Sequence, residues 1–295
     1  MNSPFIFPLS VALTYGLLAL AVCAAWLKPI KAGAVVLPPW TLLLAAACAS
    51  GWWFGLLAPP ALLTVLGFGV LAGVALRQKA GVLRTVLLIA TGAMTLAMSL
   101  HKFPGFVNPA LVAEMQLSAA SPAFTHRLNF DTATAGLILF ALFCVPAHNR
   151  QQWRDIGRNS WIILGTPALV LLAGVAGGFV AWDPKVSAYT PLFLAANLLF
   201  TCVTEEAFFR GFIQHRLAGA MDRWRAGPYL ALGIAAILFG VAHARGGPAL
   251  IVLATVAGLG YGYAYLRSKR IEAAILTHFL LNGLHFVFFT YPRAL

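Results

Sequence analysis

The chain alternates between long apolar segments and short polar connections. Ten of the apolar segments approach the roughly 20 residues that a helix needs to cross the hydrocarbon core of a bilayer. They are expected at residues 5–27, 37–57, 59–76, 84–101, 132–148, 160–182, 190–214, 228–243, 249–266 and 271–290. This pattern predicts an all-α fold, a polytopic membrane helix bundle of about ten transmembrane helices.

The pattern varies at three places along the chain. The first segment, 5–27, has no basic residues before its apolar part, so we expect a retained span rather than a cleaved signal peptide. The long fourth connection contains a mildly apolar stretch at 109–121, which predicts a short interfacial or re-entrant helix on the outer face. The polar stretch 149–159 predicts the boundary between an N-terminal membrane region (1–150) and a C-terminal domain (160–295).

The charged residues agree with a membrane protein. Only 9% of the chain is charged and 61% is hydrophobic, whereas a soluble domain is about 25% charged. The net charge of +12 does not indicate nucleic acid as a partner, because the Lys and Arg residues lie in short clusters between apolar segments. Odd-numbered connections hold 14 of them and even-numbered ones 4, a bias typical of cytoplasmic loops. We therefore expect an integral, multi-pass protein of a bacterial inner membrane, with both termini outside.

Two adjacent carboxylates and a guanidinium interrupt the apolar segment 190–214. A charged side chain near the middle of a membrane helix costs roughly 2.5–3.5 kcal/mol, so Glu205, Glu206 and Arg210 are functional candidates. On an ideal α-helix, Glu206 and Arg210 share a face, whereas Glu205 points about 140° away from Arg210. This predicts a Glu206–Arg210 ion pair and leaves Glu205 for acid–base chemistry. A lone Glu–Arg pair would favour a salt bridge that only locks two helices together, and the second carboxylate shifts the balance towards chemistry.

Further polar residues lie in the later segments. The segment 228–243 ends on His243, and the last segment carries His278, Asn282 and His285 at positions i, i+4 and i+7. The last three share one face of an apolar helix, which predicts that this face meets the protein interior or a wet cavity. His285 also fits a residue that only extends the polar face.

The depths of the candidate residues in the bilayer do not match on these boundaries. His243 lies farther outward than Glu205 and His278 when each residue advances about 1.5 Å along its helix. We expect either that the eighth helix begins earlier, near Met221, or that the helices are staggered or tilted.

Three short patterns follow one another on three separate spans. They are Glu205-Glu206-x-x-x-Arg210, Phe239-x-x-x-His243 and His278-x-x-x-Asn282. Together they resemble the three motifs of the CPBP family, the CAAX-protease and bacteriocin-processing family of intramembrane proteases that includes the Ras-converting endopeptidase. The resemblance covers roughly residues 160–295, and residues 1–150 carry no recognised motif.

The resemblance implies cleavage of a membrane-tethered peptide or C-terminal tail inside the bilayer. It implies that Glu205 and His243 hold and activate a water molecule that attacks the scissile carbonyl. It further implies that His278 and Asn282 stabilise the oxyanion of the tetrahedral intermediate. By the same resemblance, Glu206 and Arg210 support the site.

Several alternatives to this glutamic-type protease stay open. Glu205, His243 and His278 could instead hold a zinc ion with an open position, but the chain has no HExxH sequence, which favours a reaction without a cofactor. Intramembrane Glu, Arg and His residues also occur in transporters, although no inverted repeat is recognised here. A third possibility is a non-proteolytic immunity or scaffold protein, against which the complete set of motif residues argues.

Overall fold

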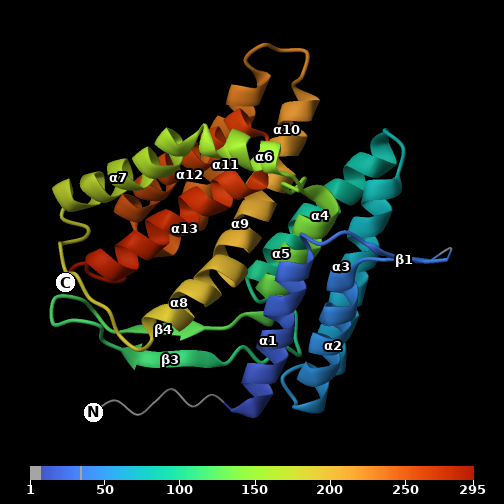
Figure 1. Ribbon diagram of the computed structural model, residues 1–295, viewed down its shortest axis with the longest axis horizontal. Helices are drawn as coiled ribbons and strands as arrows, with labels where there is room; N and C mark the ends of the chain where they lie inside the picture. The colour runs from blue at the N-terminus through green and yellow to red at the C-terminus, as the bar shows by residue number, and fades with distance from the viewer. Residues whose placement is uncertain (1–7, 34) are drawn as a thin grey trace. The chain divides into compact units, whose positions relative to one another are not determined.

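The computed structural model describes residues 8–33 and 35–295 and is mostly helical (Figure 1). Each of the ten expected spans corresponds to a helical segment, which confirms the helical membrane fold. Five of the described helices are long and apolar enough to cross a membrane, or six if Arg150–Gly157 (α6) and Ser160–Ala176 (α7), bent by 43°, form one span. The start of the expected span 5–27 lies outside the described residues. The protein is an integral multi-pass membrane protein, and the count of ten crossings stays a prediction.

The chain packs as two compact units. The first comprises the described residues up to Leu111, His126–Cys144 and Leu199–Phe208, and the second comprises Val112–Thr125, Val145–Leu198 and Phe209–Leu295. One change between the units, at residues 144–145, lies close to the composition shift at 149–159. The functional division into 1–150 and 160–295 stays a prediction.

The first unit contains mainly the early helices. Its elements are α1 (Leu9–Ala24), β1 (Ile30–Ala32), β2 (Val35–Leu37), α2 (Pro39–Trp53), α3 (Pro59–Arg77), α4 (Val82–Ser99), α5 (Phe130–Phe143) and α9 (Val203–Glu206). Helix α1 packs on α2, and α3 packs on both α4 and α5. Prolines begin α2 and α3, because the missing N–H of a first-turn proline costs no intrahelical hydrogen bond.

Helix α5 is central to the first unit. At its start the buried carboxylate of Asp131 lies 2.7 Å from Nδ1 of His101 and accepts a hydrogen bond from Asn108 Nδ2 at 3.2 Å. Farther along, α5 crosses α9 at Gly136, where an added Cβ would lie 2.2 Å from Oγ1 of Thr204. Only glycine permits this approach, so the segment that carries Glu205 packs closely against α5.

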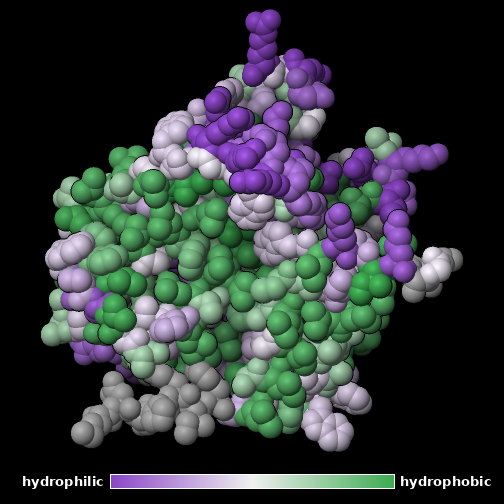
Figure 2. Space-filling model, viewed as in Figure 1, coloured by the Kyte–Doolittle hydropathy of each residue, from purple (hydrophilic) through white to green (hydrophobic). Residues whose placement is uncertain are grey.

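The second unit contains the later helices. Its elements are α6 (Arg150–Gly157), α7 (Ser160–Ala176), α8 (Thr190–Ala196), η2 (Ala207–Gln214), α10 (His215–Ala220), α11 (Gly227–Ala242), η3 (Ala244–Gly246), α12 (Pro248–Ser268) and α13 (Ile271–Phe288). Helices α7, α12 and α13 pack on one another, and α11 packs on α12 (Figure 1). In Figure 2, hydrophilic side chains gather over α6 and the α10–α11 connection, whereas apolar side chains cover most of the remaining surface shown.

Glycines set the helix spacing in the second unit. Gly240 of α11 lies against α12, where an added Cβ would meet Thr255 Oγ1 at 1.9 Å and the carbonyl oxygen of Ile251 at 2.7 Å. Gly260 of α12 lies equally close to Thr166 of α7. Close contacts between small residues are a principal source of helix association in membranes.

One continuous helix of 31 residues, Thr190–Ala220, passes through both units. It contains two π-helical segments, η1 (Asn197–Cys202) and η2, which flank the short α-helical segment α9. π-Helical turns inside α-helices occur frequently at functional sites. The two adjacent carboxylates therefore lie at an irregular part of the helix.

The helix expected at 109–121 is wrong. The structure has two paired strands there, β3 (Ala110–Met115) and β4 (Phe124–Arg127). Leu111 and Val112 are both buried although they are adjacent, and Glu114 adopts a positive φ of 50° that interrupts any helix. The hydrogen-bond partners of this segment come from the second strand, which the apolarity of 109–121 by itself does not reveal.

Candidate active site

A cavity of about 130 Å³ lies among the helices of the second unit. It is lined by residues of α7, α11, α12 and α13 and by Phe179 and Val180 of the α7–α8 connection. His243, His278 and Asn282 all line it. Three of the four predicted catalytic residues thus meet at one cavity within this unit.

His243 follows the last residue of α11. Its Nδ1 lies 2.8 Å from the carbonyl oxygen of Phe239, one turn earlier. Because a carbonyl oxygen can only accept a hydrogen bond, Nδ1 carries the proton and Nε2 of the neutral ring is the acceptor. The backbone thereby selects the tautomer whose Nε2 can accept a hydrogen bond from water.

One of the two explanations for the depth mismatch can be tested within the second unit. Helix α11 begins at Gly227, so the alternative start near Met221 is wrong. The expected stagger or tilt of the helices stays a prediction, and Phe239 contacts both histidine rings. Its ring centroid lies 4.7 Å from that of His243 and 5.7 Å from that of His278.

His278 and Asn282 are held from different sides. The ring of His278, which is 4% exposed, stacks on Tyr261 with centroids 4.7 Å apart and an interplanar angle of 16°. Asn282, one turn later, donates a hydrogen bond from Nδ2 to Oδ1 of Asn197 at 3.3 Å. This bond fixes which side of the Asn282 amide carries its N–H donors.

Arg210 connects α12 to the aromatic rings around the cavity. Its side chain is fully buried, and Nη2 donates a hydrogen bond to the carbonyl oxygen of Gly258 at 2.9 Å. The guanidinium carbon lies 4.6 Å from the ring centroid of Phe239 and 5.1 Å from that of Tyr261. The same rings contact His243 and His278, so Arg210 supports the site through cation–π contacts that the sequence did not predict.

Glu205 and Glu206 lie in α9, in the first unit. Glu206 is fully buried and Glu205 is half-buried. Oε2 of Glu205 and the hydroxyls of Thr204 and Thr134 are enclosed without a hydrogen-bond partner among the described residues. Enclosed polar atoms of this kind are normally satisfied by ordered water or a bound ligand, so the surroundings of Glu205 suit a water-handling carboxylate.

The ideal-helix angles used for Glu205, Glu206 and Arg210 do not apply. The π-helical segment η2 begins directly after Glu206, and its hydrogen bonds join residues five apart rather than four. The 140° separation expected between Glu205 and Arg210 is therefore wrong for this helix. The Glu206–Arg210 ion pair stays a prediction.

The structure adds residues that the sequence analysis missed. Asn197 is an isolated polar residue in an apolar span, which could have marked it, whereas Tyr261 had no distinguishing signal. His285 also lines the cavity, with Nε2 3.1 Å from the carbonyl oxygen of Thr290. It therefore helps to close the end of α13 as well as extending the polar face.

The zinc-dependent alternative concerns residues of both units. Among residues 8–33 and 35–295, no three His, Cys, Asp or Glu side chains come together as a metal-binding group. Glu205 belongs to the first unit and His243 and His278 to the second, so zinc binding by these three residues stays a prediction. No step of the mechanism is therefore derived through a metal.

Comparison with known proteins identifies part of the chain. Residues 187–284, about a third of the chain, match the model of a family described as type II CAAX prenyl endopeptidase Rce1-like. No curated protein and no solved structure matches the chain. The matched residues include all three patterns, from Glu205 to Asn282. The region that carries the carboxylates and the histidines is therefore Rce1-like, as the three motifs predicted.

Proposed function

We propose that the protein is an intramembrane endopeptidase that cleaves a membrane-tethered peptide or C-terminal tail at a bacterial inner membrane. The observation that carries this proposal is the meeting of His243, His278 and Asn282 at one cavity within a region that matches an endopeptidase family. A cavity of about 130 Å³ has room for about four water molecules. It therefore suits a water molecule and a scissile peptide group, but not a long lipid chain.

His243 and Glu205 activate the attacking water in this proposal. The Nε2 acceptor of His243 takes a hydrogen bond from the water, and the carboxylate of Glu205 takes the proton as the oxygen attacks the scissile carbonyl carbon. The same proton then passes to the leaving amine when the C–N bond breaks. The reaction consumes one water molecule and forms a carboxylate and an amine.

His278 and Asn282 stabilise the oxyanion of the tetrahedral intermediate. Donors fixed in place before the reaction are effective because they do not reorganise as charge develops, and removing one costs about 2.7–4 kcal/mol. The stacking of His278 on Tyr261 and the bond from Asn282 to Asn197 supply this preorganisation.

The assignment of Glu205 rests on its helix and its surroundings. The Thr190–Ala220 helix is tied to α13 by Asn197, eight residues before Glu205, and to α12 by Arg210, five residues after it. Glu205 thus occupies the stretch between two attachments to cavity-lining helices. Its enclosed Oε2, which has no partner among the described residues, is suited to hold the water.

The proposal is tested by replacing the carboxylate without changing its shape. Peptide termini of all membrane proteins are mapped by mass spectrometry in native cells that carry the wild type, Glu205→Gln, or Glu114→Gln as a control in β3. We expect a set of cleavage-derived termini that is present in the wild type and in the control but absent in Glu205→Gln. An unchanged set of termini would refute the proposal.

We further propose that the reaction needs no metal. Purified protein treated with a tight chelator should retain its cleavage of the substrate found in that screen. Loss of cleavage that added zinc restores would instead support the zinc-dependent alternative.

A further inference from the structure

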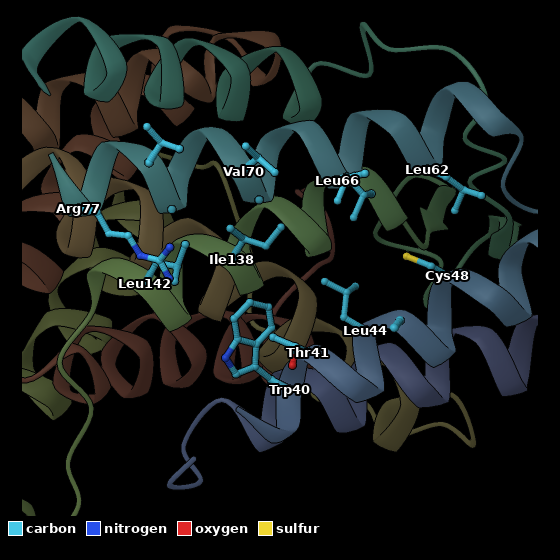
Figure 3. Close-up of a pocket in the computed structure, with 15 residues that line it drawn as sticks. Trp40, Thr41, Leu44, Cys48, Leu62, Leu66, Val70, Arg77, Ile138 and Leu142 are labelled. Atoms are coloured by element: carbon cyan, nitrogen blue, oxygen red, sulfur yellow. The ribbon is translucent and has the colours of Figure 1, made fainter. Parts of the chain in front are cut away.

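An apolar groove runs along the first unit. It has a volume of about 620 Å³ and lies between α2 and α3, with Ile138 and Leu142 of α5 as its floor (Figure 3). Ligand pockets typically measure about 300–1,000 Å³. The groove is therefore large enough for an extended small molecule.

The polar groups of the groove gather at one end. Arg77 is in the last turn of α3, and Trp40 and Thr41 are in the first turn of α2. Figure 3 shows the Arg77 guanidinium beside Leu142, whereas Cys48 and Leu62 lie toward the opposite end. Apart from these groups the lining is almost wholly apolar, so the groove matches an amphiphile with one polar head.

The length of the groove fits a lipid chain. Leu62 and Arg77 are fifteen residues apart on α3, or about 22 Å at 1.5 Å per residue. One leaflet of the hydrocarbon core is about 15 Å thick, half of the ~30 Å bilayer core. The groove is therefore long enough for an acyl chain of the leaflet nearest Arg77 to lie in it from end to end of the chain.

The charge at the polar end selects the head group. Arg77 belongs to a basic connection that also contains Lys79 and Arg84, and the distribution of basic residues predicts that it faces the cytoplasm. A guanidinium binds phosphate through two parallel N–H donors. Trp40 places an indole N–H near the same end, as is typical at the membrane interface.

We propose that this groove binds one anionic phospholipid of the cytoplasmic leaflet. Its phosphate lies against Arg77, and one acyl chain extends between α2 and α3 toward Cys48. The proposal concerns the first unit and does not depend on the proteolytic function.

Trp40 provides the measurement, because bromine on a neighbouring acyl chain quenches indole fluorescence. The full-length protein is reconstituted in vesicles that contain brominated phosphatidylglycerol or brominated phosphatidylcholine, and the Trp40 signal is the difference between wild type and Trp40→Phe. We expect brominated phosphatidylglycerol to quench this signal at a mole fraction about fivefold lower than brominated phosphatidylcholine does. A factor of about five is what one cationic side chain contributes at an anionic membrane surface. Equal quenching by the two lipids, or quenching by neither, would overturn the proposal.

Two matched pairs of variants locate the site. Arg77→Gln should abolish the fivefold preference, whereas Lys79→Gln, the same charge change outside the groove lining, should retain it. Gly73 belongs to the lining, and a Cβ added there would meet no neighbouring side chain within 4 Å. Gly73→Phe therefore places a ring in the groove and should reduce quenching by both lipids at least twofold. Gly67→Phe, on the same helix and also in open space but outside the lining, should not. Equal effects within both pairs would contradict a lipid site at this groove.

Discussion

Replacing Arg210 by lysine separates the geometry of the guanidinium from its charge. Arginine donates hydrogen bonds in the plane of its head group and contacts aromatic rings through the faces of that plane. Arg210 uses both directions, with Gly258 as acceptor and the rings of Phe239 and Tyr261 within 5.1 Å. A lysine ammonium at the end of a shorter side chain can keep at most one of these contacts at full strength.

The expected loss of stability is about 3 kcal/mol. A hydrogen bond from a charged donor contributes about 1.5–3 kcal/mol, and a desolvated cation–π contact contributes up to about 2 kcal/mol. If the substituted lysine keeps the bond to Gly258, loss of the two ring contacts accounts for about 2–4 kcal/mol. The cost of burying the charge does not offset this loss, because an ammonium is more strongly hydrated than a guanidinium and is no easier to bury.

Reversible unfolding by SDS in mixed micelles measures this difference, with tryptophan fluorescence as the signal. Arg245→Lys, an exposed position in η3, is the control and should unfold as the wild type does. A double-mutant cycle with Phe239→Leu should give a coupling of about 1–2 kcal/mol between the ring and Arg210. If Arg210→Lys unfolds within about 0.5 kcal/mol of the wild type, or if the two changes are additive, the aromatic support of the site is refuted.

Three further predictions follow from the described packing. Gly240→Ala should destabilise the protein by about 1–3 kcal/mol because the added methyl group overpacks against α12. Gly233→Ala, in open space on the same helix, should leave the stability unchanged. Equal midpoints of SDS unfolding for the two variants would contradict this prediction. Asn197→Ala should lower kcat about tenfold to a hundredfold with little change in KM, because the amide of Asn282 loses its orientation; a change in KM alone would argue against a positioning role. Burial lowers the pKa of His126 below its ordinary value of 6.5, so its contribution to stability is present above pH 6.5 and is lost as the pH falls below that value. Thermal unfolding at about pH 7.5 and about pH 5.5 should therefore differ less in His126→Gln than in the wild type, and an equal difference would refute the assignment.

The order and type of most elements followed from local properties of the chain. Apolar segments of about 20 residues cannot leave their backbone groups unpaired in a bilayer, so they form helices wherever they occur. Prolines at positions 39 and 59 begin helices because their rings fit the first turn. The three patterns from Glu205 to Asn282 were readable for the same reason, since charged and polar residues in apolar spans are costly and few.

Only the tertiary structure decided how these elements meet. The strand within 109–121 pairs with the strand that follows it, Phe124–Arg127, and the composition of the segment does not encode this pairing. The π-helical turn after Glu206 changed which side chains share a face, and periodicity arguments assume an ideal helix. His243 and His278 line one cavity because α11 and α13 both pack against α12. The aromatic support of Arg210 and the groove beside Arg77 each arise from three helical segments, and no single segment contains the information for either.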